Sequence, residues 1–251
     1  MKRFIFFLYG IICYIIFLGA FLYAIGFTGD LVVTKTIDSG FQGGIGGTLI
    51  VNLLLLSLFA VQHSVMARQA FKKRWTKIIP RPIERSTYVL FSSLVLIILF
   101  YFWRPLPEQI WNTGGTVIAP ILTVLFFGGW FVVLTGTYLI NHFKLFGLQQ
   151  VYLYLKKREQ QYPKFVTPFY YQFVRHPLML GFIIAFWAAP VMTLGHLLFA
   201  VASTGYILIA IQLEEQDLVR FHGEAYKRYQ REVSQIIPMP RRKNILVENV
   251  R

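Results

Sequence analysis

Long uninterrupted apolar runs, rather than alternating apolar and polar positions, dominate the hydrophobic pattern of this chain. Four runs cover about residues 4–27, 48–66, 86–103 and 116–140, and a fifth extends over 178–211. At a rise of 1.5 Å per residue, the first four have the length of helices that cross a hydrocarbon core of about 30 Å. Continuous runs exclude a transmembrane β-barrel, whose strands alternate lipid-facing and lumen-facing residues.

The fifth run is too long for a single span. As one helix its 34 residues would measure roughly 50 Å, and Pro190, Gly195 and His196 lie near its centre. The pattern therefore predicts a hairpin of two helices, over about residues 178–194 and 196–211. A hairpin returns the chain to the membrane face from which it left.

The composition agrees with an all-α, polytopic membrane helix bundle. Of 251 residues, 56% are hydrophobic, and the mean hydropathy is +0.55. We expect one integral-membrane domain over residues 1–251, with about five to six spans, a C-terminal helical hairpin and a cytoplasmic cofactor pocket. Another helix, over about residues 214–232, is expected at the membrane surface.

Basic residues account for the net charge of +14, and they gather in the loops between alternate runs. Residues 67–85 contain seven lysines and arginines against Glu84, and the loop before residue 174 is also basic. The positive-inside rule places these loops and both termini in the cytoplasm, as in a bacterial inner-membrane protein. The lipid bilayer is therefore the expected partner of this charge, and nucleic acid is not.

Polar side chains converge on the same cytoplasmic level from the ends of several runs. Such groups at the edge of a membrane bundle are costly and are commonly functional. Arg85 and Arg175 also suit a simple role as membrane anchors, and His63 and His142 suit interfacial histidines. No metal is expected, because the histidine spacing matches no zinc-ligand pattern. The convergent residues are His63, Glu84, Arg85, Tyr88, Asn141, His142, Arg175, His176, Glu214, Glu215 and Asp217.

Two C-terminal motifs resemble the signature of the isoprenylcysteine carboxyl methyltransferase superfamily. Residues 175–181 read Arg-His-Pro-Leu-Met-Leu-Gly, and residues 213–226 contain Glu-Glu-Gln-Asp and Phe-His-Gly-Glu-Ala-Tyr. Members of that superfamily are integral-membrane enzymes that use S-adenosyl-L-methionine (SAM). The resemblance implies a SAM-binding region over residues 141–240. The implied cofactor-binding residues are Arg175, His176, Pro177, Leu178, Glu214, Glu215, Tyr226 and Tyr229.

Three earlier segments, residues 61–68, 82–88 and 141–148, are similar to the bacterial methanethiol S-methyltransferases. That family methylates methanethiol to dimethyl sulfide. The resemblance therefore implies a small thiol as the substrate and in-line methyl transfer to its thiolate.

The chemistry of a thiol acceptor suggests roles for the earlier segments. The thiolate is the nucleophile, so the site needs a base or a cation at the reacting centre. His63 and His142 are the candidate bases, and Arg85 is the candidate for stabilising the thiolate. The remaining candidates for substrate binding are Glu84, Tyr88, Asn141 and Phe143.

Other functions fit parts of the same pattern. A prenylcysteine carboxylate or a phospholipid amine could replace the thiol as methyl acceptor. A NADPH-dependent sterol-type reductase has a similar C-terminal layout. A transporter or channel is less compatible, because it would place charged groups in the middle of its spans, and this chain has almost none there.

Overall fold

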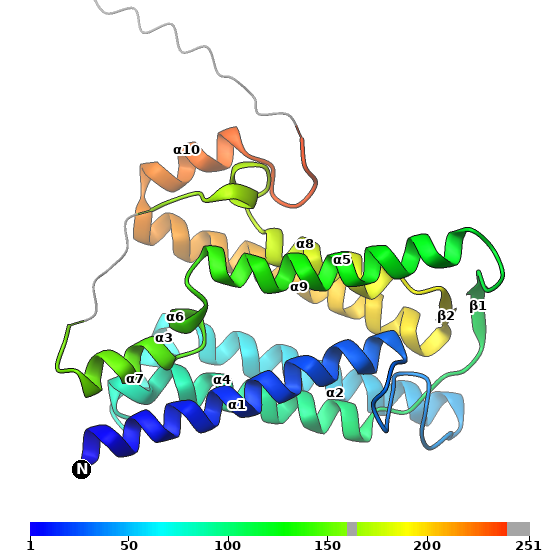
Figure 1. Ribbon diagram of the computed structural model, residues 1–251, viewed down its shortest axis with the longest axis horizontal. Coiled ribbons are helices and arrows are strands. Elements are labelled where there is room, and N and C mark those ends of the chain that lie inside the picture. Colours follow the sequence, from blue (N-terminus) through cyan, green and yellow to red (C-terminus); the bar gives the residue numbers. More distant parts are fainter. Residues whose placement is uncertain (160–164, 240–251) are drawn as a thin grey trace, which may run out of the picture.

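The structure is a computed structural model that describes residues 1–159 and 165–239. It is an all-α helical bundle, as the sequence predicts (Figure 1). The expected SAM-binding region, residues 141–240, lies outside the described residues at 160–164 and at 240. Among the described residues, five helices are long and apolar enough to cross a membrane: α1 (Lys2–Gly29), α2 (Ile45–Ala67), α4 (Arg81–Phe102), α5 (Ile118–Leu139) and α9 (Leu194–His222).

Short helices gather at the end of the bundle where the chain begins (Figure 1). They contain or adjoin basic residues, which suit the membrane surface better than its interior. These helices are α3 (Gln69–Trp75), α6 (His142–Leu145), α7 (Leu148–Leu155) and α10 (Glu224–Glu232). A 3-10 turn, η1 (Phe169–Gln172), precedes the hairpin.

The predicted hairpin is present, but its two limbs are unequal. The first limb, α8 (Pro177–Trp187), has 11 residues and rises only about 16 Å, roughly half of a hydrocarbon core. The second limb, α9, continues to His222 instead of ending at residue 211. The expected surface helix over 214–232 is thus divided. It breaks at Gly223, whose φ of 59° is a conformation that glycine adopts without strain.

A two-stranded antiparallel sheet closes the opposite end of the bundle. Strand β1 (Gln109–Asn112) lies between α4 and α5, and β2 (Val191–Thr193) lies at the turn of the hairpin. The indole nitrogen of Trp111 also donates to the Ala189 carbonyl oxygen over 3.0 Å. The sheet therefore ties the hairpin turn to the α4–α5 loop, far from the short helices (Figure 1).

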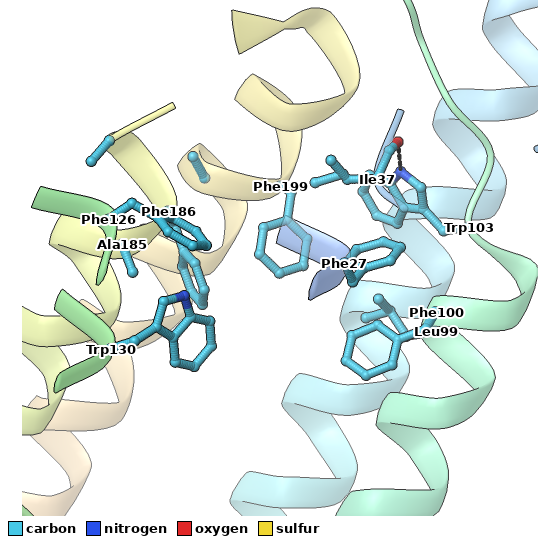
Figure 2. Packing of buried hydrophobic residues seen from close by; sticks show 12 residues of the cluster. Phe27, Ile37, Leu99, Phe100, Trp103, Phe126, Trp130, Ala185, Phe186 and Phe199 are labelled. Atoms are coloured by element: carbon cyan, nitrogen blue, oxygen red, sulfur yellow. Dashed lines mark hydrogen bonds between the residues drawn. The ribbon is translucent and has the colours of Figure 1, made fainter. Parts of the chain in front are cut away.

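The hydrophobic core lies toward the sheet end and consists largely of aromatic rings. Phe199 of α9 is central, with ring centroids 6.2 Å from Phe27, 5.7 Å from Trp103 and 5.0 Å from Phe186 (Figure 2). The Trp103 indole nitrogen donates to the Ile37 carbonyl oxygen over 3.1 Å. This core fixes the hairpin against α1 and α4.

Helices α5 and α8 approach each other closely because glycines face each other. A Cβ atom at Gly129 would lie 2.6 Å from the Gly181 carbonyl oxygen, and one at Gly181 would lie 2.7 Å from the Gly129 oxygen. Small residues at helix interfaces are typical of membrane bundles, where close backbone approach favours association. This contact joins the start of the hairpin to the helix that ends just before His142.

Candidate functional site

The two polar ends of the hairpin meet, as the sequence predicts. Arg175, just before α8, donates from Nε to Oε1 of Glu215 on α9 over 2.6 Å. Nε2 of His176 donates to the same oxygen over 3.0 Å, and the Gln230 amide donates to Oε2 over 2.8 Å. The side chains of Arg175 and Glu215 are only 10% and 7% exposed. We refer to these four residues as the Glu215 cluster.

Arg175 also connects the hairpin to α10 and to the residues after it. Its Nη1 donates to the carbonyl oxygens of Gln230 and Val233. Its backbone nitrogen donates to the Ser234 oxygen over 2.9 Å. The guanidinium is therefore occupied by protein partners, and its expected contact with a cofactor stays a prediction.

Three other residues of the expected SAM-binding set lie beside the Glu215 cluster. Pro177 occupies the first turn of α8, where its missing N–H costs nothing. Leu178 packs against Gly136 of α5. A Cβ atom added at Gly136 would lie 3.2 Å from the Leu178 side chain. Glu214 is half-exposed, with its carboxylate 3.7 Å from Nδ1 of His176.

Tyr226 and Tyr229 of α10 form an aromatic support for Phe165. Their ring centroids lie 5.7 Å and 5.3 Å from the Phe165 ring. The Tyr226 hydroxyl donates to Glu215 Oε1 over 3.5 Å, and the Tyr229 hydroxyl donates to the Tyr171 oxygen. Burial raises the pKa of Tyr226, so this phenol is neutral. The Glu215 cluster thus positions Phe165 through α10.

His142 is held in one tautomer by two hydroxyl groups. Thr137 donates its hydroxyl hydrogen to the Leu134 oxygen over 2.6 Å, so toward His142 Nδ1, at 2.7 Å, it acts as acceptor. The network therefore assigns the ring proton to Nδ1. Nε2 is left as the basic atom, and it accepts from the Tyr14 hydroxyl over 2.7 Å.

Aromatic rings surround His142, and burial keeps its imidazole uncharged at neutral pH. The Tyr138 ring stacks on the imidazole at 4.3 Å, and Phe146 lies 4.8 Å away. Burial lowers the pKa of His142 below its usual value, because desolvation disfavours the imidazolium. At neutral pH the residue is therefore an uncharged base.

His63 belongs to a second hydrogen-bonded group, centred on α4. Its Nε2 lies 2.8 Å from the Tyr88 hydroxyl, and its Nδ1 lies 3.2 Å from Ser92 Oγ. The Arg85 guanidinium lies over the Tyr88 ring at 4.9 Å, and its Nε donates to the Leu145 oxygen over 2.7 Å. Arg85 thus connects the His63 group to α6, which begins with His142. Glu84 lies in the first turn of α4, where a carboxylate is favourable.

A cleft of about 660 Å³ opens between the α5–α6 junction and the C-terminal end of α9. This volume is typical of small-molecule sites. The expected residues Asn141, His142 and Phe143 line it, whereas His63 and Glu215 are not among the described lining residues. The lining consists of Tyr138, Leu139, Ile140, Asn141, His142, Phe143, Lys144, Phe165, Val166, Phe221 and His222.

Several residues of this site escape sequence reasoning. Tyr14 is one of three tyrosines inside the first apolar run, and nothing in the sequence connects it to His142. Thr137 precedes His142 by five residues, a spacing that suggests a contact only once the helix end is known. Lys144 and Phe165 appear in the sequence as ordinary members of a basic loop.

The chain is similar to known proteins over most of its length. The family described as NnrU protein matches residues 51–229. Methanethiol S-methyltransferase 1 of Bradyrhizobium diazoefficiens is 55% identical over 239 residues, covering 95% of this chain and 84% of that protein. Methanethiol S-methyltransferase of Mycobacterium tuberculosis is 52% identical over 242 residues, covering 96% and 99%. Nurim of Xenopus laevis is 27% identical over 189 residues, covering 71% and 65%. No solved structure matches the chain.

Proposed function

The chain belongs to the NnrU protein family and to the methanethiol S-methyltransferases, and from this premise we propose that it methylates methanethiol to dimethyl sulfide. It is an enzyme that transfers methyl groups. We further propose SAM as the methyl donor and the cleft beside His142 as the site of reaction. The observation that carries this assignment is a buried histidine, hydrogen-bonded at both ring nitrogens, in an aromatic cleft of ligand size.

The residues of the cleft fit SAM. Four of the lining residues are aromatic, with Tyr138 and Phe143 from the α5–α6 junction, Phe165 from the segment before η1 and Phe221 from α9. Such rings stack on adenine and face a sulfonium cation favourably. Among the described lining residues none is acidic, so a cation there would depend on the rings. SAM would supply an electrophilic methyl group on its sulfonium.

The C-terminal residues hold the cofactor side of the site in this proposal. Arg175, His176 and Glu215 fix α10, and Pro177 and Leu178 fix the start of α8. Tyr226 and Tyr229 support the Phe165 wall. Glu214, half-exposed and 3.7 Å from Nδ1 of His176, accepts hydrogen bonds from the ribose or the amine of the donor in this proposal.

The acceptor side is formed by the earlier helices. The thiol proton passes to the Tyr14 oxygen as the Tyr14 hydroxyl hydrogen moves to Nε2 of His142, the atom that its tautomer leaves basic. Thiols are mostly protonated at neutral pH, and a positioned base contributes about 10²- to 10⁴-fold in rate. Asn141 and Phe143 line the acceptor space beside it.

The group around His63 contributes the remaining polar contacts in the same proposal. Arg85, between Tyr88 and the Leu145 oxygen, supplies positive charge near the reacting thiolate. His63 is the second candidate base. Tyr88 and Glu84 complete the acceptor side.

The protein is an integral membrane protein with five apolar helices of spanning length among its described residues. We propose that it lies in a bacterial inner membrane with both termini and the cleft on the cytoplasmic side. The support is the positive-inside rule, since the basic loops and the short helices share one end of the bundle (Figure 1).

Gas chromatography of the headspace above purified protein tests the reaction. With SAM and methanethiol supplied, dimethyl sulfide should accumulate in proportion to enzyme and should be absent when SAM or protein is omitted. Methylation of a prenylcysteine or a phospholipid amine, without dimethyl sulfide, would transfer the assignment to another acceptor. Oxidation of NADPH with a sterol and no methyl transfer would contradict the methyltransferase assignment itself.

A further inference from the structure

We propose that Lys144 binds the carboxylate of the methyl donor's amino-acid moiety, in the cleft beside His142. This inference rests on the proposed use of SAM. It assigns the carboxylate contact to Lys144, whereas Arg175 holds Glu215 and the residues of α10. Three observations carry it, namely the occupied guanidinium of Arg175, the charge of the cleft lining and the fixed backbone at Lys144.

Arg175, the first choice for a carboxylate partner, is already saturated. Its Nε and Nη2 donate to the two oxygens of Glu215, over 2.6 Å and 3.3 Å. Its Nη1 donates to two carbonyl oxygens, those of Gln230 and Val233. Turning Arg175 toward a ligand would leave a buried Glu215 carboxylate without its cation, which is strongly unfavourable. Arg175 is also outside the described lining of the cleft.

Lys144 is the one lysine or arginine among the described lining residues. The other described lining residues are apolar or aromatic, together with Asn141, His142 and His222. His142 is neutral at physiological pH, so it does not supply the charge. None of the described acidic residues forms an ion pair with Lys144. An anionic group in the cleft therefore meets this ammonium without competition from a protein carboxylate.

The backbone around Lys144 is fixed independently of any ligand. Asn141 adopts a φ of 84° and accepts from the Lys144 nitrogen through Oδ1 over 3.0 Å. The Lys144 oxygen in turn accepts from the Gln150 amide over 2.9 Å. The origin of the side chain is thus held two residues from His142. A donor whose carboxylate meets Lys144 is anchored close to the base.

Titration of the purified, full-length protein with two ligands tests this role. S-adenosyl-L-homocysteine carries the amino-acid carboxylate, and 5′-methylthioadenosine carries the same adenosine without it. We expect Lys144→Gln to weaken binding of S-adenosyl-L-homocysteine about tenfold and to leave binding of 5′-methylthioadenosine within about twofold. Lys144→Arg, which keeps the charge, should restore most of the affinity.

Lys156→Gln is the matched control. Lys156 is a lysine of the same loop, lies outside the described lining and contacts the Tyr152 ring at 5.9 Å. The Lys156→Gln substitution should leave the affinities for S-adenosyl-L-homocysteine and 5′-methylthioadenosine unchanged. An equal loss for both ligands in Lys144→Gln, or no loss for either, would overturn the role of Lys144 while the methyltransferase assignment stands. If the wild-type protein binds neither ligand, both the role and the proposed use of SAM fail.

Discussion

The Tyr14 hydroxyl donates to Nε2 of His142, which connects the first transmembrane helix to the proposed base. Because Thr137 holds the opposite nitrogen, Nε2 is the atom that must take a proton, and Tyr14 already contacts it. We expect Tyr14→Phe to lower kcat about fivefold, equivalent to one hydrogen bond of about 1 kcal/mol. Affinity for S-adenosyl-L-homocysteine should change less than about twofold.

Tyr9→Phe is the control for that substitution. Tyr9 lies on the same helix, and its hydroxyl is bonded to Thr87 Oγ1 at 3.0 Å. Its removal should leave kcat near the wild-type value. Equal rates in wild type and Tyr14→Phe would show that the Tyr14 hydroxyl has no part in proton transfer.

The pH dependence of the rate should distinguish the two candidate bases. Burial lowers the pKa of His142 below the usual 6.5, so its basic form persists at neutral pH and is lost only as the pH falls toward that lower pKa. The wild-type rate should therefore decline in acid. His142→Asn should lower the rate at pH 7 by about 10²-fold or more and recover at high pH, where thiols ionise unaided.

His63→Asn supplies the comparison at the second histidine. It breaks the contacts with Tyr88 and Ser92 and leaves the cleft intact. We expect a smaller loss of rate at pH 7 than in His142→Asn. The rate of His63→Asn should still decline in acid, as in the wild type. The opposite result, a high-pH recovery in His63→Asn alone, would identify His63 as the base.

The fold was largely accessible from the sequence, because apolar runs of spanning length leave few alternatives. The hairpin followed from a run that was too long for one helix. The end of α9 did not, since the polar residues 214–217, three of them acidic, resemble the start of a surface segment. The structure shows them inside the helix, where Glu215 is neutralised by Arg175 from a distant part of the chain. Long-range pairing of this kind has no local signature.

The candidate site could be predicted only in part, because many of its contacts join residues that are far apart in the sequence. Asn141 and His142 could be predicted because they are polar residues at the end of an apolar run, and Phe143 because it belongs to the segment 141–148 that is similar to the methanethiol S-methyltransferases. Their partners could not, because Tyr14 and Phe165 come from segments that meet α6 only through tertiary packing. The sequence also suggested Arg175 as a ligand contact, whereas its hydrogen-bond partners become visible only in three dimensions.

Removing the Glu215 carboxylate should destabilise the protein. Glu215→Ala would leave the Arg175 guanidinium buried and unpaired, a change that costs about 3–5 kcal/mol. The unfolding temperature in detergent should fall by roughly 10 °C. Affinity for SAM, measured by calorimetry below that temperature, should also fall because the Phe165 wall loses its support.

Glu224→Ala is the matched control for this loss. Glu224 is an exposed carboxylate of α10 that pairs only at the surface with Lys227. Such pairs contribute little to stability, so its unfolding temperature should stay within about 2 °C of wild type. Similar effects of the two substitutions would mean that the Glu215 cluster does not hold α10 in place.

Close packing between α5 and α8 should be sensitive to a single methyl group. In Gly129→Ala the new Cβ would lie 2.6 Å from the Gly181 oxygen and 2.7 Å from the Ala185 nitrogen, so the helices must separate. We expect a loss of about 1–3 kcal/mol in the free energy of unfolding. Gly128→Ala, whose Cβ meets no atom within 4 Å, should be neutral or slightly stabilising because alanine favours helix. Identical unfolding temperatures for the two variants would contradict this packing. A lower rate in Gly129→Ala alone would show that the α5–α8 contact also positions His142.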